Sequence, residues 1–204
     1  MKKDIYEKLK ERFGDVASWA LYQAPDISSK DKHSNVGDMS IFQEDKLLDK
    51  LHANIVMIAL NASVHPARPD GYTGPWQMFH SAYHKGFDYR IRESVKDTPL
   101  EGCYMTDMIK NYPEAKSKAV KDKMKDEPEW LQGNLSVLRE ELDMLEAKPT
   151  LIALGGSVYD ALSDAGFGQD YKLVKLHHYS YIIKGGDSNY YQYVQKVLKE
   201  NSII

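Results

Sequence analysis

The sequence contains very little cysteine and no apolar run long enough to cross a membrane. Cys103, the single cysteine among 204 residues, cannot form an internal disulfide and cannot supply the thiolates of an iron–sulfur cluster or a structural zinc site. The first residues alternate charged and apolar side chains, whereas a secretory signal needs a continuous apolar segment. We therefore expect a cytoplasmic protein that makes no contact with membranes.

The chain also lacks a strong excess of charge and a glycine-rich dinucleotide-binding fingerprint. It has 27 basic and 30 acidic residues and a net charge of −3, so any contact with nucleic acid must come from a local patch. Without the fingerprint or a set of metal ligands, we expect no cofactor and no metal. A chain of 204 residues that is 42% hydrophobic is typical of one domain, which we expect to be monomeric.

Four short apolar runs predict buried strands at residues 55–60, 102–106, 150–154 and 172–176. Helical patterns lie between most of them, notably at 131–147, where leucines recur on one face. This alternation predicts an α/β fold: a three-layer α/β/α domain around a mostly parallel sheet of about four strands.

The flanking segments complete the predicted domain over residues 1–204. Residues 1–52 are expected to be a helical cover, with helices near 4–13 and 41–52, and residues 53–204 form the α/β core. The lysine-rich segment 112–130 is expected to be a solvated loop or a short exposed helix.

Polar side chains follow the ends of three predicted strands. Asn61 follows the first strand, Asp107 the second and His178 the fourth, and the carboxyl ends of parallel strands line a ligand crevice. The long connection after Asn61 carries Tyr72 and Phe79, and loops of this length are usually functional. Together these groups are suited to binding a flat polar ring.

These segments resemble, in order, motifs of the uracil-DNA glycosylase superfamily. The first motif, Gly-x-Asn/Asp-Pro-x, corresponds to residues 59–63 (Ala-Leu-Asn-Ala-Ser), and the last, His-Pro-Ser-Pro, to residues 178–181 (His-Tyr-Ser-Tyr). Residues 103–107 take the place of the strand that ends in the family's base-reading Asn, and residues 148–155 resemble its Lys-Pro-x-apolar-Leu-Gly stretch. The chain departs from the pattern at Ala59, Ala62, Asp107 and Tyr179.

The resemblance implies an N-glycosylase that hydrolyses the bond to a flipped uracil-like, damaged or modified base in single- or double-stranded DNA. Asn61 would hold the attacking water, and His178 would donate a hydrogen bond to the leaving base. Phe79, or Tyr72 in its place, would stack on the base, and Asp107 would read its edge. The expected DNA contacts are Ser63, Ser157 and Ser180 to phosphates, with Tyr181 and Ile182 as wedge residues.

Each of these residues also has a simpler interpretation. Asn61 is equally typical of a turn at a strand exit, and a histidine pair can close a hydrogen-bond network. Strand alternation points His177 away from His178, so His177 is interpreted as structural. His65, His80 and His84 could form a zinc set, and the last two share helical spacing, but without a carboxylate motif they indicate a surface face rather than zinc.

Three functions remain open from the sequence. The first is a base-excising glycosylase, and the second is a catalytically inactive relative that binds nucleic acid. The third is an enzyme acting on small nucleosides or nucleotides, which would need a closed pocket rather than a positive groove.

Overall fold

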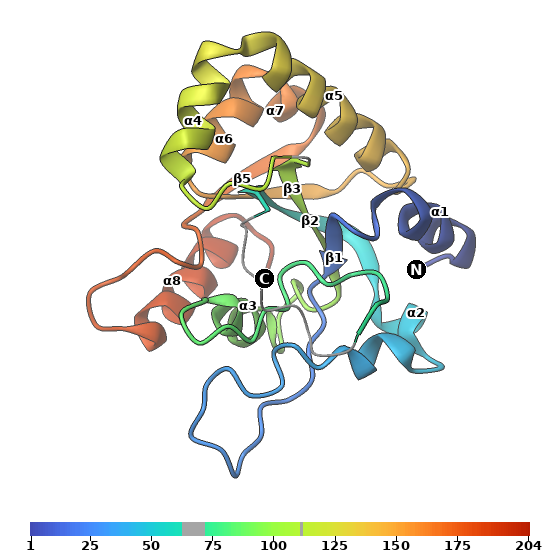
Figure 1. Cartoon of the computed structure of the whole chain (residues 1–204), viewed down its shortest axis with the longest axis vertical. Coiled ribbons are helices and arrows are strands. Elements are labelled where there is room, and N and C mark those ends of the chain that lie inside the picture. The colour runs from blue at the N-terminus through green and yellow to red at the C-terminus, as the bar shows by residue number, and fades with distance from the viewer. Residues whose placement is uncertain (63–71, 111) are drawn as a thin grey trace.

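The sheet of this protein has five strands and is mostly parallel. The computed structural model describes residues 1–62, 72–110 and 112–204. Within them the strands have the order β1-β3-β2-β4-β5 (Figure 1). Their bounds are β1 Ala17–Trp19, β2 His52–Asn61, β3 Cys103–Ile109, β4 Thr150–Leu154 and β5 Lys172–Leu176. Strands β2 to β5 are parallel, and β1 runs antiparallel along β3.

The prediction of a mostly parallel sheet is confirmed, with two differences. Strand β1 is a fifth strand and comes from the segment expected to be a helical cover. Strand β3 continues to Ile109, so Asp107 lies within the strand rather than after it.

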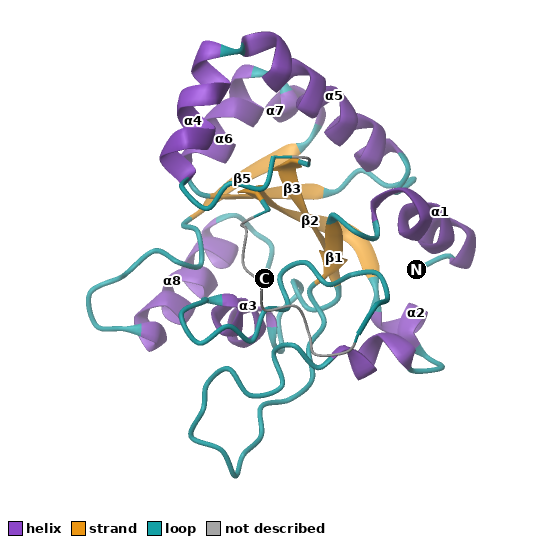
Figure 2. Ribbon diagram, in the orientation of Figure 1, coloured by secondary structure: helices purple, strands orange, loops and turns teal. Residues whose placement is uncertain are grey.

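Helices cover both faces of the sheet (Figure 2). Figure 1 shows α4 to α7 on one side and α3 and α8 on the other. The first group has the bounds α4 Ser117–Asp126, α5 Pro128–Asp143, α6 Gly156–Asp164 and α7 Phe167–Asp170, and α1 Lys3–Phe13 packs into the same core cluster. The second group is α3 Asp88–Val95 and α8 Asp187–Glu200.

The structure corrects the expected helix at residues 41–52 and decides between a loop and a helix for the lysine-rich segment 112–130. The expected helix at 41–52 is replaced by a 3-10 helix, η1 Met39–Gln43, and one turn, α2 Leu47–Lys50, because β2 already begins at His52. The lysine-rich segment forms the exposed helix α4, in which only Val120 is buried. No helix in the described part of the chain is both long and apolar enough to cross a bilayer.

Alternation along the central strands divides the core into two layers. Tyr104 and Met108 of β3 face the layer that contains α5, whereas Met105 faces the layer that contains α3 and α8. Thr106 also contacts α5, through the carboxylate of Glu141. Because successive side chains alternate, Asp107 points to the side of α3 and α8.

Candidate active site

A cavity of about 1570 Å³ opens at the carboxyl ends of the parallel strands. Asn61 at the end of β2, Asp107 of β3 and the segments after β4 and β5 form part of its wall. Asn61, Asp107 and His178 therefore lie at one end of the sheet, around a common space. Residues from elsewhere that line it include Met78, Phe79, Phe87 and Asp88.

Asn61 uses its amide nitrogen to connect the ends of two strands. The two N–H groups of Nδ2 are shared among three backbone oxygens, those of Ala62 (2.9 Å), Tyr112 (3.1 Å) and Glu114 (2.9 Å). These contacts support the interpretation of Asn61 as a residue that stabilises a strand exit. They also fix the carboxamide, because Nδ2 faces the chain and the oxygen Oδ1 is left to accept a hydrogen bond from water.

His178 is held as a neutral imidazole. Its Nδ1 accepts a hydrogen bond from the backbone N–H of Ser180 (3.1 Å) and lies 2.8 Å from the Ser180 hydroxyl oxygen. A ring nitrogen that accepts from an N–H carries no proton, so the proton of the neutral ring is on Nε2. Burial lowers the pKa of His178 to about 4. The ring therefore presents an N–H donor over the physiological pH range.

His177 packs among aromatic rings, as expected for a structural residue. Its ring stacks on Tyr181 and Tyr193, with centroids 4.3 and 4.7 Å away. Its backbone N–H donates to the hydroxyl of Tyr193 at 3.1 Å. The packing also brings Tyr181 to the rim of the cavity.

Asp107 is a buried carboxyl group in the wall of this cavity. It is 2% exposed, and neither carboxyl oxygen has a partner among the described residues. Burial, reinforced by Glu141 and Asp88 and opposed by Lys110, raises the pKa of Asp107 to about 7. An unsatisfied buried carboxyl group is costly, and such groups cluster at functional sites.

Asp88 is a second carboxyl group in the same wall, and the sequence analysis did not identify it. It begins α3, and its Oδ2 accepts from the backbone N–H of Ser81 at 2.9 Å. Burial raises the pKa of Asp88 to about 6 against the effect of that hydrogen bond. After burial, Asp88 and Asp107 are the largest causes of the raised pKa of Tyr179, so the three groups lie near one another.

Of the two rings considered for stacking on the base, Phe79 is the one that lines the cavity. Its side chain is 7% exposed, and its backbone has a φ of 65°, an uncommon conformation for a residue other than glycine. The Phe79 carbonyl accepts from the hydroxyl of Tyr22 at 3.0 Å. Tyr72, the alternative stacking residue, is not among the described residues of the wall and packs against the core cluster that contains Trp76.

The expected DNA-contacting residues lie at this cavity as far as they are described. Ser157, in the first turn of α6, and Ser180 line it. Gly155, with a φ of 105°, makes the turn that starts α6 there. Tyr181 and Ile182 also line it and are 52% and 77% exposed. Ser63 lies outside the described residues.

The histidines considered for zinc form no metal site among the described residues. No group of three potential ligands occurs there. His80 is fully buried, so its assignment to a surface face was wrong. Its ring nitrogens lie 2.8 Å from the carbonyl of Met78 and 3.1 Å from that of Leu21. His65 lies outside the described residues.

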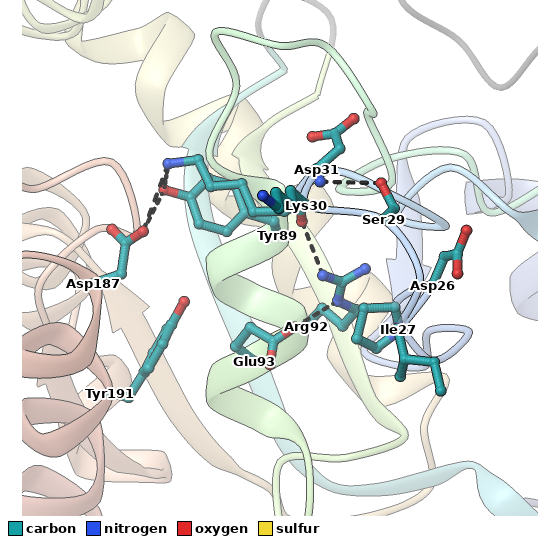
Figure 3. A pocket seen from close by; sticks show the side chains of 12 residues that line it. Asp26, Ile27, Ser29, Lys30, Asp31, Tyr89, Arg92, Glu93, Asp187 and Tyr191 are labelled. Carbon is teal, nitrogen blue, oxygen red and sulfur yellow. Dashed lines mark hydrogen bonds and ion pairs between the residues drawn. The ribbon is translucent and has the colours of Figure 1, made fainter.

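A second, smaller cavity of about 370 Å³ lies between the loop after β1, α3 and α8. Figure 3 shows Asp187 directed at Tyr89 and Glu93 directed at Arg92. Tyr89 accepts from Lys32 (2.8 Å) and donates to Asp187 (3.0 Å), and Arg92 binds Glu93 (2.8 Å). These groups satisfy one another, whereas the carboxyl oxygens of Asp107 in the larger cavity have no partner in the described part of the chain.

The fold and the cavity together define an α/β protein with a polar site at the carboxyl ends of a mostly parallel sheet. Comparison of the sequence with protein-family models and with curated proteins finds no match.

Proposed function

We propose that the protein is a DNA-base N-glycosylase of the uracil-DNA glycosylase type. The observation that supports this proposal most strongly is the pairing of Asn61 with a neutral, Nε2-protonated His178 on the wall of one cavity. The two groups come from different strand ends and meet the two requirements of the reaction.

Hydrolysis of an N-glycosidic bond places positive charge on the sugar and negative charge on the departing base. The bond between C1′ and the base nitrogen breaks with its electron pair going to the base, while a water oxygen bonds to C1′. The Nε2–H of His178 stabilises the charge on the base, as preorganised donors do at developing anions. The Oδ1 of Asn61 orients the water, whose proton leaves late because an amide is a weak base; the proton passes through solvent to the departed base anion.

The neighbouring groups are suited to holding an extruded nucleotide. Phe79 offers a ring for stacking in the cavity, and the exposed Tyr181 and Ile182 are apolar groups beside His178 that can enter the vacated duplex position. Ser157 supplies its hydroxyl and backbone N–H to a phosphate, and Ser180 supplies its hydroxyl, since the Ser180 N–H is held by His178.

The test is incubation with oligonucleotides that each carry one altered base, followed by alkaline cleavage at abasic sites. We expect release of at least one base from single- or double-stranded DNA by the unmodified protein. Asn189→Ala, which alters a residue of α8 outside the described cavity wall, serves as the control. Absence of release across the panel would contradict the proposal.

A second candidate, an enzyme on free nucleosides, is favoured by the charge of the wall. Its described residues include four acidic side chains, Asp15, Asp88, Asp107 and Glu114, but only two basic ones, Lys85 and Lys121. A site for phosphorylated polymers is usually basic. Release of free base from deoxynucleosides, and none from oligonucleotides, would favour this candidate.

A further inference from the structure

Two carboxyl groups from distant parts of the sequence face the same cavity. Asp107 comes from the middle of β3 and Asp88 from the first residue of α3. Asp107 is 2% exposed and lacks any hydrogen-bond partner among the described residues. Asp88 has one oxygen held by the backbone N–H of Ser81. The wall therefore has carboxyl oxygens that the described protein leaves without donors.

Lys110, the basic group that lowers the pKa of Asp107, already has another partner. Lys110 binds Glu141 at 2.5 Å and also contacts the hydroxyl of Thr106. Glu141 is fully buried and also accepts from the hydroxyl of Tyr104 at 2.9 Å. The charge of Lys110 is thus largely offset by Glu141. The basic residues among the described part of the wall, Lys85 and Lys121, are both exposed.

Aromatic faces accompany the carboxyl groups. Phe79 and Tyr179 line the cavity, and Tyr179 also stacks on His178 with a centroid distance of 4.0 Å. A cation beside such faces is stabilised by the ring quadrupole, most strongly where water is excluded.

We propose that Asp88 and Asp107 select a base that presents N–H donors and carries a positive charge, such as an N-alkylated aminopyrimidine. An ionised carboxyl group can only accept hydrogen bonds, so an amino group suits it and a carbonyl oxygen is repelled. A cationic ring also offsets one of the two negative charges when both carboxyl groups are ionised, which matters most at Asp107 because a buried, unpaired carboxylate is costly. The inference rests on the proposed function in taking the ligand to be a nucleobase.

The groups around Asp88 and Asp107 determine how the protonation of these two carboxyl groups changes when a ligand binds. Asp107 is influenced by Lys110, Glu141 and Asp88, and Asp88 by the N–H of Ser81. Tyr22 and Tyr179 complete the surroundings. Binding of a cation favours the ionised form of both carboxyl groups, so complex formation near neutral pH should release protons.

A matched pair of ligands tests the inference by titration calorimetry. One is 3-methyl-2′-deoxycytidine, cationic at neutral pH, and the other is 3-methyl-2′-deoxyuridine, which has the same N-methyl group but a neutral ring with an oxygen in place of the amino group. We expect the cation to bind at least tenfold more tightly, because each buried charge contact contributes on this scale. Titration in buffers of different ionisation enthalpy should report proton release for the cation alone.

The variants Asp88→Asn and Asp107→Asn keep the side-chain volume and remove the charge. Each should reduce the preference for the cation by about tenfold, and the double variant should abolish it. Glu200→Gln, at the end of α8 and outside the described cavity wall, removes one negative charge elsewhere and is the control; it should leave the preference unchanged. Equal binding of the two ligands, or tighter binding of the uridine, would overturn the inference.

The binding preference and the base-release assay test the carboxyl pair and the glycosylase function separately. A preference for the cation without base release from any oligonucleotide would contradict the glycosylase and support the carboxyl pair. Base release without that preference would support the glycosylase and overturn the carboxyl pair.

Discussion

The protonation state of His178 is determined by two features of its surroundings. The backbone N–H of Ser180 occupies Nδ1, and burial disfavours the imidazolium form. Both keep Nε2–H as a donor, so its contribution to catalysis should not vary with pH above about 5, given a pKa of about 4.

We expect His178→Ala and Asn61→Ala each to lower single-turnover base release by about 10²–10³-fold. His178→Gln retains a donor and should recover part of the rate. The measurement is product formation with excess enzyme, with thermal unfolding to verify the fold. Full activity in both alanine variants would show that these residues do not perform the chemistry.

Asp107 should make the protein less stable as the pH rises. Its folded-state pKa is about 7, against an ordinary value of 3.8, so between these pH values the folded state holds a proton that the unfolded state has lost. The free energy of unfolding should therefore fall as pH increases through this window, by about 1.4 kcal/mol per unit of pKa difference. Urea unfolding at pH 5 and pH 8 should show a smaller fall for Asp107→Asn. An unchanged fall in the variant would place the effect elsewhere, for example at Asp88.

The same carboxyl group should make uracil a poor substrate at neutral pH. An ionised Asp107 can accept from uracil N3–H but sets a negative oxygen against O4, at a cost of about 1–3 kcal/mol. Uracil release should rise as the pH falls from 8 to 6, because protonated Asp107 regains a donor, and Asp107→Asn should improve it at all pH values. Efficient uracil release at pH 8 that Asp107→Asn does not improve would contradict this reading of the base edge.

At the scale of elements, the apolar runs were enough to predict the four parallel strands. β4 and β5 have the predicted bounds because continuous buried runs leave little ambiguity. β1 was missed because three residues provide too short a pattern. Asp88 was missed for a tertiary reason, since an acidic residue at a helix start is ordinary in sequence and only the fold places it in the cavity wall.

The contact between β3 and α5 depends on a buried ion pair. Lys110 and Glu141 lie 2.5 Å apart, and Glu141 also accepts from Tyr104 and Thr106 at 2.9 Å. Lys110→Met should reduce the free energy of unfolding by about 3–5 kcal/mol, because it leaves a buried carboxylate without its cation. Adding Glu141→Gln to that variant should recover part of the loss. Urea unfolding measures both, and a loss below about 1 kcal/mol would show that the pair is not buried as described.

At the scale of the whole molecule, charge limits how the protein can hold DNA. The chain has a net charge of −3, and the basic residues among the described part of the cavity wall are Lys85 and Lys121. Affinity for DNA falls with salt in proportion to the number of phosphates that basic groups neutralise. Few such contacts predict a shallow dependence, with a slope of log K against log salt of about −1 to −3 for duplex DNA.

Fluorescence anisotropy of a labelled duplex between 50 and 200 mM salt measures this slope. Lys85→Gln and Lys121→Gln should each make it shallower by about one unit, whereas Lys199→Gln should not change it. Lys199 lies in the last turn of α8, two residues before Asn201. The carbonyl of Asn201 accepts from Lys172, the first residue of β5, so Lys199 lies at the end of the sheet opposite to the cavity. A slope steeper than about −6, or an equal effect of Lys199→Gln, would mean that DNA is bound on another surface, and the cavity would then be suited to free nucleosides.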